Sequence, residues 1–377
     1  MYTNLLGGLT PHQFLSEYWQ KKPLLVRQAV PGFNGLLPND ALFDLACDPD
    51  VESRLVRRSG DEWELVHGPQ KRRALRGKKH PWTILVQGLN LFLPEADALL
   101  HRFDFIPQAR LDDLMVSYAV DGGGVGPHFD NYDVFLLQGH GRRRWQIAAQ
   151  EDRRLVEGAP LKILQHFVPE HDWVLEPGDM LYLPPHWAHN GIAVGECTTY
   201  SIGFRSPDAR ELGTEFLTWL QDRLTLEGLY ADPDLQPQTH SALIGEAMVE
   251  QIDGMLAGIT WTRTDVAAFL GHYLTEPKPH VFFDAPEEPL SPARFVKIAS
   301  QRGLHLDRRS LMLFTNAHFY LNGERFGEQP WNDDERRILA MLADTRHLPP
   351  GTPLPDRLAQ ALHQAYCDGF IAVGAVP

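Results

Sequence analysis

The sequence has few cysteines and no long apolar run, and each absence argues against a class of protein. Only three of its 377 residues are cysteines, and none forms a CxxC pair, which argues against a disulfide scaffold and a thiolate zinc site. No apolar run approaches the roughly 18 residues of a membrane-spanning helix. The N-terminus lacks a basic stretch followed by an apolar one, so we expect no signal peptide. We expect a cytoplasmic protein without a membrane partner.

Positive charge is also scarce. There are 35 Lys and Arg against 49 Asp and Glu, giving a formal net charge of -14. Because affinity for phosphates is built from clustered basic residues, direct nucleic-acid binding is not expected. The basic run from Lys71 to Lys79 could touch RNA, but a solvated loop is the preferred interpretation. An acidic protein also fits a basic partner.

The order of predicted elements divides the chain into three parts. A helix is expected from Thr10 to about Gln20 and a hairpin over 51–67, and short strands rich in β-branched and aromatic residues follow over about 82–206. Many short strands at this spacing favour a closed or double-sheet β architecture. Helical periodicity follows to about 276, for example at Leu243, Ala247, Ile252 and Leu256. The tail reads as helix, hairpin with a turn at Asn322-Gly323, and two more helices.

The main chemical constellation is His128-Phe129-Asp130 together with His189. Residues i and i+2 of a strand point to the same face, so His128 and Asp130 can converge on one metal ion. Two imidazoles and one carboxylate form the facial triad of non-haem Fe(II) oxygenases. His186 competes with His189 as the third ligand, and His189 is preferred because in similar sequences the ligand follows the Pro-Pro loop rather than opening it. An isolated HxD is common by chance, but here a Gly-rich turn precedes it.

A cosubstrate site is suggested by the segment Gly141 to Trp145. If the cosubstrate is 2-oxoglutarate, its far carboxylate needs a cation inside the barrel, and a guanidinium grips a carboxylate with two hydrogen bonds. Arg143 would point inward, while Arg142 and Arg144 point the opposite way. An exposed basic triplet is the alternative. Ser201 could donate a hydrogen bond to the cosubstrate, although an ordinary core serine is an equal alternative.

Several segments resemble the Jumonji-C (JmjC) oxygenases, in particular the bacterial ribosomal oxygenases. They are FLSEYWQKKPLLVR, SYAVDGGGVGPHFDNYDVFLLQGHGRRRWQI, LEPGDMLYLPPHWAHNG and TTYSIGFRSP, which span most of residues 10–206. The resemblance implies an α+β chain with a double-stranded β-helix core, a jelly-roll and cupin-like fold. It further implies a JmjC oxygenase domain over 1–206 (β-helix core about 82–206), a helical dimerisation region over 207–276 and a winged-helix-like domain over 277–377.

The activity implied by this resemblance is that of a 2-oxoglutarate-dependent dioxygenase with Fe(II), 2-oxoglutarate and O2. Its substrate would be the β-carbon (C3) of an arginine in large-subunit ribosomal protein sixteen, and the enzyme would be a homodimer. An arginine substrate needs an acid and aromatic walls, so Asp121 is expected to bind its guanidinium. Tyr118 and Tyr132 would flank its stem, and Ser206 would donate a further hydrogen bond. Asp121 in a turn and tyrosines in strands also have ordinary structural explanations.

Two other functions fit the same residues. A cupin-type sensor could retain the metal without turnover and read DNA with its tail, although Asp333, Asp334 and Glu335 offset the basic Arg308 and Arg309 there. An oxygenase of the same chemistry could instead act on an RNA base or a methylated lysine.

Overall fold

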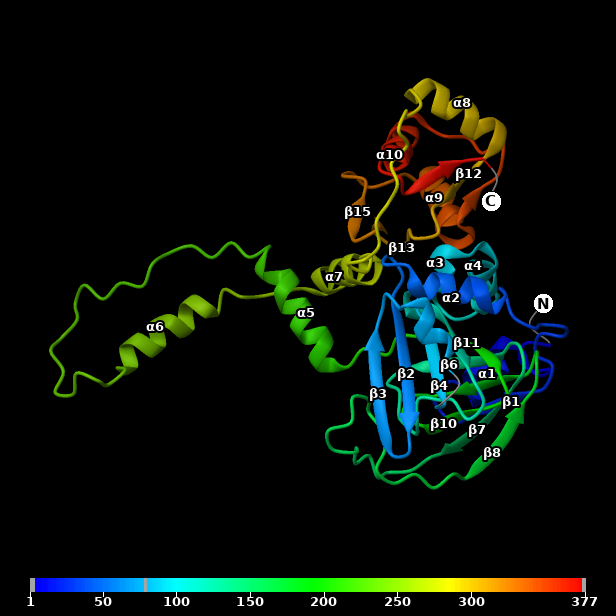
Figure 1. The fold of residues 1–377 in the computed structure, drawn as a ribbon. Coiled ribbons are helices and arrows are strands. Elements are labelled where there is room, and N and C mark those ends of the chain that lie inside the picture. Colours follow the sequence, from blue (N-terminus) through cyan, green and yellow to red (C-terminus); the bar gives the residue numbers. More distant parts are fainter. Residues whose placement is uncertain (1–3, 78–79, 375–377) are drawn as a thin grey trace.

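Two facing β-sheets form the first half of the chain (Figure 1). The structure is a computed structural model that describes residues 4–77 and 80–374. The larger sheet has eight strands in the order β1-β9-β6-β11-β5-β4-β2-β3, and every neighbouring pair is antiparallel. Its strands are β1 (Leu24–Val26), β2 (Ser53–Ser59), β3 (Glu62–His67), β4 (Trp82–Val86), β5 (Leu111–Ala119), β6 (Asp133–Gln138), β9 (Met180–Leu183) and β11 (Cys197–Phe204).

The smaller sheet has three antiparallel strands, β10 (Ala188–Val194), β7 (Arg142–Ala148) and β8 (His171–Leu175). Strand β6 shows how the two sheets face each other, because its six residues are all buried and its four apolar residues divide between two cores. Val134 and Leu136 pack against β7 and β8 in one core, whereas Phe135 and Leu137 face the other way. This pairing of sheets is the expected jelly-roll architecture.

Helices cover the outer face of the large sheet. They are α1 (Pro11–Glu17), α2 (Asn39–Cys47), α3 (Leu89–Phe92) and α4 (Pro94–Leu100), with short 3-10 turns at Arg72–Arg76, His101–Phe103 and Gln108–Arg110. Thr10 caps α1 in a capping box with Gln13, as the sequence predicts for this helix start. Phe14 is fully buried and contacts Phe135 and Tyr182 of the sheet. This outer core fixes the sheet from behind and leaves its inner face free to line a site.

The last two residues of the basic run from Lys71 to Lys79, Lys78 and Lys79, lie outside the described residues. Arg72 forms ion pairs with Asp40 and Asp44 of α2, while Lys71, Arg73 and Arg76 are exposed or half-exposed. One member of the run is therefore structural.

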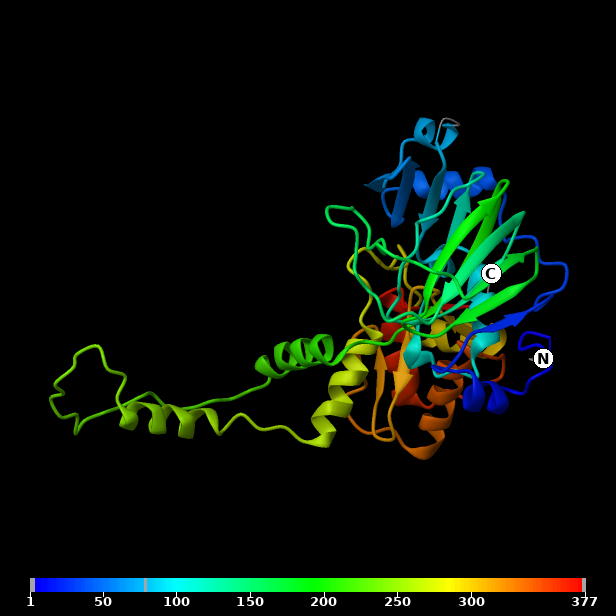
Figure 2. The same ribbon diagram turned by 90° about the horizontal axis from the view of Figure 1, so that it is seen from below.

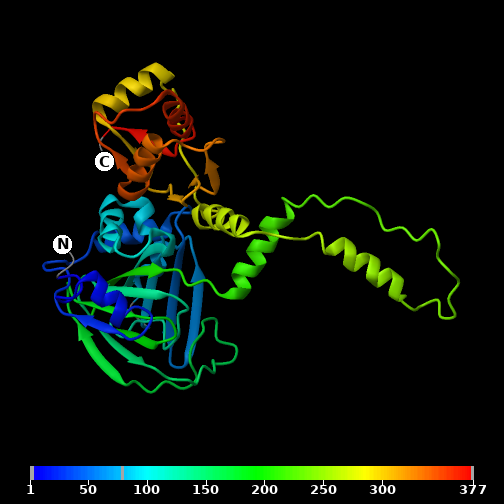
Figure 3. The same cartoon turned by 180° about the vertical axis from the view of Figure 1, so that it is seen from behind.

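An extended arm connects the two halves of the molecule. It contains α5 (Ala209–Gln221), α6 (Glu246–Leu256) and α7 (Arg263–Thr275), and all three ribbon views show α6 and its flanking loops reaching away from the rest (Figures 1, 2 and 3). No residue of α6 is buried, so its apolar side chains face solvent. Leu243, which the periodicity assigns to a helix, lies outside it because Gly245 caps α6.

The C-terminal part is a small α+β unit. Its elements are α8 (Pro292–Arg302), β12 (Leu304–Leu306), β13 (Met312–Phe314), β14 (Phe319–Leu321), β15 (Glu324–Phe326), α9 (Asp333–Thr345), β16 (His347–Leu348), α10 (Asp356–Cys367) and β17 (Ile371–Val373). Strands β14 and β15 form the predicted hairpin, and both Asn322 (φ 50°) and Gly323 (φ 87°) have the left-handed backbone that such a two-residue turn requires. Among the described residues, no helix is long and apolar enough to span a bilayer.

Helix α7 packs directly on this unit through a glycine. A Cβ atom on Gly271 would lie 2.3–2.5 Å from ring atoms of Tyr320, which is 2% exposed. Thr275 accepts a hydrogen bond from the Gly323 amide at 2.9 Å, so helix and hairpin are also fastened through polar groups.

We expect Gly271→Ala to destabilise the protein, although alanine is favoured over glycine in a helix by about 1 kcal/mol. Overpacking against the buried Tyr320 should cost about 1–3 kcal/mol and outweigh that gain. The midpoint of urea denaturation measures the change. Gly254→Ala in α6 is the matched control, because its Cβ would meet nothing within 4 Å and should leave stability equal or higher. Equal behaviour of the two variants would contradict the close packing.

Candidate metal centre

A short backbone bridge brings the two histidines together. The His128 amide donates to the His189 carbonyl at 3.0 Å, and the His189 amide donates to the His128 carbonyl at 2.9 Å. His189 lies on β10, whereas the segment around His128 is an isolated bridge and not the regular strand that the sequence suggested. Pro127 has no amide hydrogen, which limits the ladder on this side. The bridge nevertheless sets both side chains on one face.

The glycine-rich turn before His128 lets the chain approach β10. A Cβ on Gly124 would lie 2.3 Å from the Gly191 carbonyl oxygen, so only glycine fits there. Gly126 has φ +79° and packs under Trp63 and Ile163, which again leaves no room for a side chain. The glycines therefore allow the HxD segment to lie against β10.

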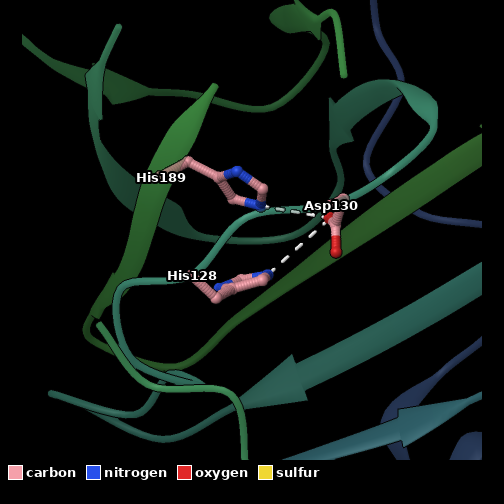
Figure 4. Close-up of side chains that lie close together, drawn as sticks. All are labelled: His128, Asp130 and His189. Carbon is pink, nitrogen blue, oxygen red and sulfur yellow. Dashed lines mark ion pairs between the residues drawn. The ribbon is translucent and has the colours of Figure 1, made fainter. Parts of the chain in front are cut away.

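Three ligand atoms converge at this point (Figure 4). The Asp130 Oδ2 atom lies 3.3 Å from His189 Nε2 and 3.7 Å from His128 Nε2. The ligand atoms of His128, Asp130 and His189 all lie within 4.8 Å of one another. A cation between them would replace these direct contacts.

Both imidazoles are oriented by their other nitrogen. His128 Nδ1 lies 2.9 Å from the Gly126 carbonyl oxygen, and His189 Nδ1 lies 2.9 Å from that of Trp187. Because a carbonyl only accepts, each Nδ1 donates and carries the proton. Each Nε2 can then present a lone pair to a metal, which is the usual arrangement of metal-ligating histidines.

The charges within the triad are coupled. Burial opposes the charged form of Asp130, but the two histidines outweigh it and lower the pKa of its carboxyl to about 2. Burial also opposes charge on His189, but the hydrogen bond and charge of Asp130 prevail and raise its pKa. Burial and the neighbouring His189 lower the pKa of His128. The carboxylate is therefore ready for a metal, while binding must displace any proton on His189 Nε2.

His186, the alternative third ligand, lines the same cavity but is not part of the convergent group. It is exposed, has a positive φ of 68°, and its backbone amide donates to the Asp130 carbonyl. Its backbone therefore supports the loop that carries Asp130.

The triad opens into a cavity of about 620 Å³ between the two sheets. Arg143 lies in its wall and is 4% exposed, whereas Arg142 and Arg144 face outward. The Arg143 Nη1 atom donates to Ser117 Oγ at 3.0 Å, and its Nε and Nη2 atoms are buried without a hydrogen-bond partner in the described structure. Such a half-free guanidinium fits a carboxylate. Ser201 also lines the cavity and is 8% exposed.

Of the four residues proposed from the sequence to bind substrate, only Tyr132 lines this cavity, with 39% of its surface exposed. The Asp121 carboxylate instead accepts a hydrogen bond from the Gly195 amide in a turn. Tyr118 is buried against Phe43 and Trp82 in the outer core. Ser206 Oγ accepts a hydrogen bond from Arg110 beyond the last core strand.

Besides Asp130, two acids line the cavity that the sequence analysis did not identify. Asp112 and Asp113 begin β5, and Asp113, Met115 and Ser117 share its inner face. Tyr118 lies one residue out of phase, so it points to the opposite face. Residues two apart on a strand share a face, so placing Ser117 on the inner face would have placed Met115 and Asp113 there as well. Burial raises the pKa of the Asp113 carboxyl, and its Oδ2 accepts a hydrogen bond from the Gly88 amide at 2.8 Å.

Two facing sheets that enclose a His-Asp-His cluster define a cupin-like non-haem oxygenase architecture. In agreement, a sequence family described as JmjC domain matches residues 98–212, and a ROXA-like winged helix matches residues 258–364. The ribosomal protein uL16 3-hydroxylase of Escherichia coli is 33% identical over 316 residues, which cover 83% of this chain and 84% of that protein. A probable ribosomal oxygenase of Haemophilus influenzae is 38% identical over 254 residues, covering 66% and 61% of the two chains.

Solved structures extend the similarity across the whole chain. The X-ray structure of E. coli YcfD matches with a TM-score of 0.82 and 30% identity, covering 97% of this chain and 98% of that one. A structure of the same ribosomal oxygenase with cobalt and 2-oxoglutarate matches with a TM-score of 0.79 and 30% identity, covering 97% and 99%. The chain belongs to the JmjC-domain ribosomal oxygenase family.

We expect His128→Ala to abolish metal binding, because two ligands alone no longer form the triad. Titration of the purified protein with Mn(II) or Co(II) by calorimetry measures this directly. His186→Ala is the control, since that side chain is outside the convergent group, and it should bind metal with nearly unchanged affinity. Equal metal affinity of His128→Ala and wild type would contradict the ligand assignment.

We expect Arg143→Met to weaken 2-oxoglutarate binding by about 10- to 100-fold, which is the loss that one charge-assisted contact predicts. The dissociation constant for 2-oxoglutarate with Mn(II)-loaded protein measures this loss. Arg144→Met is the matched control, because Arg144 points outward and pairs with Asp172. If only Arg144→Met lost affinity for 2-oxoglutarate, the carboxylate contact would have to be assigned to the opposite face of the strand.

Proposed function

We propose that this protein is an Fe(II)- and 2-oxoglutarate-dependent dioxygenase that hydroxylates the β-carbon (C3) of an arginine in ribosomal protein uL16. The observation that carries the proposal is one cavity that joins a His-Asp-His cluster to a buried guanidinium with two free donor nitrogens. The similarity to the E. coli uL16 3-hydroxylase supports the substrate.

Separate groups of residues in the cavity would bind the metal and 2-oxoglutarate. His128, Asp130 and His189 would hold Fe(II) and leave three positions of an octahedron free. Arg143 and Ser117 would bind the far carboxylate of 2-oxoglutarate, and Ser201 would line its stem. The bound metal, 2-oxoglutarate and O2 together supply the oxidation that inserts one oxygen atom into a substrate C–H bond, with succinate and CO2 as the other products.

The substrate arginine would enter from the side of Asp113. A carboxylate is the natural partner of a guanidinium, and burial makes an unpaired Asp113 charge unfavourable, so an incoming cation would stabilise its charged form. Asp112 already pairs with Arg205 at 3.1 Å and Lys278 at 3.4 Å. Tyr132 at the cavity would pack on the arginine stem. Binding the far end of the side chain at Asp113 leaves the β-carbon free to face the metal.

The exposed apolar side chains of the arm support the proposal that the protein forms a homodimer. The arm exposes many apolar side chains, and an exposed apolar patch of this kind usually marks an interaction surface. Those more than half exposed are Leu217, Leu226, Leu229, Leu235, Leu243, Ile244, Leu256 and Trp261. We propose that a second copy of the chain covers them.

The arm is also the most acidic part of the protein. Residues 207–276 contain twelve Asp and Glu but only three Arg and no Lys. Since ribosomal proteins are basic, this charge would steer the substrate toward the enzyme, and the effect should weaken with salt. We expect the enzyme to act in the cytoplasm and not to depend on direct nucleic-acid binding.

Hydroxylation of uL16 tests the function. Incubation with Fe(II), 2-oxoglutarate and O2 should give substrate-dependent succinate and a mass increase of one oxygen atom (+16) on an arginine of uL16. Mass spectrometry of the digested substrate and a succinate assay measure both products. If no ribosomal protein, uL16 included, stimulates succinate formation, the proposed function is wrong.

A pair of substitutions separates the two acids proposed for the guanidinium. Asp113→Asn should raise the KM for uL16 by about tenfold or more, because a charge-assisted contact is lost. Asp121→Asn should leave that KM unchanged, since Asp121 only closes a turn. If Asp121→Asn raised the KM and Asp113→Asn did not, Asp121 would be the residue that binds the substrate guanidinium.

A further inference from the structure

One wall of the cavity carries polar side chains that the proposed reaction does not use. Arg54 of β2 and Thr83 and Gln87 at β4 all line the cavity, and we call these three residues the side wall. The register of the sheet explains why they share a face: Arg54 pairs with Leu85, and Val56 pairs with Thr83. Residues two apart on a strand point the same way, so Thr83, Leu85 and Gln87 all turn inward.

The side wall contains buried polar atoms without partners. Arg54 Nε, Thr83 Oγ1 and Gln87 Oε1 are fully covered, yet none has a hydrogen-bond partner within residues 4–77 and 80–374. Arg54, which lines the cavity, also forms no ion pair among those residues. Buried polar groups are nearly always hydrogen-bonded in native proteins, because an unpaired group costs about 1–3 kcal/mol. Three such atoms on neighbouring strands indicate a bound partner.

The two acids at the start of β5 already have partners. Asp112 pairs with Arg205 and Lys278, and Asp113 accepts the Gly88 amide. Arg143 donates to Ser117, and its two free nitrogens are the ones proposed to bind 2-oxoglutarate. These groups lie on β5 and β7, whereas the side wall lies on β2 and at β4.

The kinds of atom in the side wall select the chemistry of its partner. The Arg54 guanidinium only donates hydrogen bonds, the Gln87 Oε1 atom only accepts them, and the Thr83 hydroxyl does either. A carboxylate would satisfy Arg54 but leave Gln87 Oε1 unpaired. A guanidinium would satisfy Gln87 but meet the positive charge of Arg54. A peptide group offers a carbonyl oxygen and an amide hydrogen together, and it satisfies both.

We propose that the side wall binds the main chain of the substrate segment around the target arginine. Arg54 donates to a main-chain carbonyl oxygen, and Gln87 accepts from a main-chain amide. This subsite rests on the proposed function, because it needs a peptide substrate. It lets the enzyme recognise an extended segment independently of its side chains, while Asp113 recognises the arginine itself.

The charge of Arg54 adds selectivity. A substrate guanidinium is repelled from the side wall and attracted to Asp113 on β5, two strands away in the order β2-β4-β5. The arginine side chain therefore has one favourable orientation in the cavity. Holding the backbone on one wall and the guanidinium on another fixes the position of the β-carbon between them.

Calorimetry with Mn(II)- and 2-oxoglutarate-loaded protein tests the subsite without turnover. The ligand is a uL16 peptide around the hydroxylated arginine, compared with versions N-methylated at one amide at a time. Arg54→Met and Gln87→Met should each weaken peptide binding about tenfold, whereas 2-oxoglutarate affinity stays within about twofold of wild type. Arg54→Lys should recover part of the loss. Arg57→Met is the control, because Arg57 lies on the same strand, points outward and pairs with Glu64.

The N-methylated peptides identify the contact from the substrate side. For wild type, methylation of one amide near the arginine should cost about tenfold, and Gln87→Met should no longer respond to methylation at that amide. Unchanged peptide affinity in both variants, or a loss of 2-oxoglutarate affinity instead, would overturn the subsite. If wild type neither binds nor hydroxylates any uL16 peptide, the proposed function fails, and the subsite falls with it.

Discussion

The site depends on two backbone hydrogen bonds between residues that are 61 positions apart in the sequence. The reciprocal bonds between His128 and His189 hold the HxD segment against β10, at 3.0 and 2.9 Å. The glycines before His128 leave room for the HxD segment to lie against β10. The carbonyls of Gly126 and Trp187 then orient the two imidazoles. The backbone therefore brings together the three side chains that would bind the metal, and backbone carbonyls orient the two imidazoles.

The two-sheet architecture separates packing from chemistry. Strand β6 of the large sheet directs one set of side chains to the helices behind it and the alternate set to the cavity, as Phe135 and Leu136 show. The outer set is aromatic and aliphatic and fully buried. The inner set can therefore include charged groups, such as Asp113 and Arg54, without weakening the main core. Each of these groups is paired within the protein or faces the cavity, where a ligand can satisfy it.

The sequence was sufficient for the architecture and for the residues that converge on the metal position. Strand alternation, turn glycines and the HxD spacing are local signals, and they also separate the inward Arg143 from the outward Arg144. The residues that we propose to bind the substrate were harder to predict because they depend on which face of β5 points inward. Asp121 and Tyr118 were selected by residue type near the Gly-rich turn, whereas the inner face belongs to Asp113 and Ser117. The side wall lies more than 40 residues upstream of the HxD motif, and only the sheet register brings it to the cavity.

The donor set of the triad also has a consequence for the supply of metal in the cell. Two imidazoles and one carboxylate carry no strong preference for iron, and divalent zinc, nickel and copper bind such ligands at least as tightly as ferrous iron does. The coordination geometry at the His128–His189 bridge cannot by itself reject these ions. The active fraction of the protein in vivo is then set by the relative abundance of exchangeable metals, so iron limitation would lower the yield of functional enzyme before it affected folding.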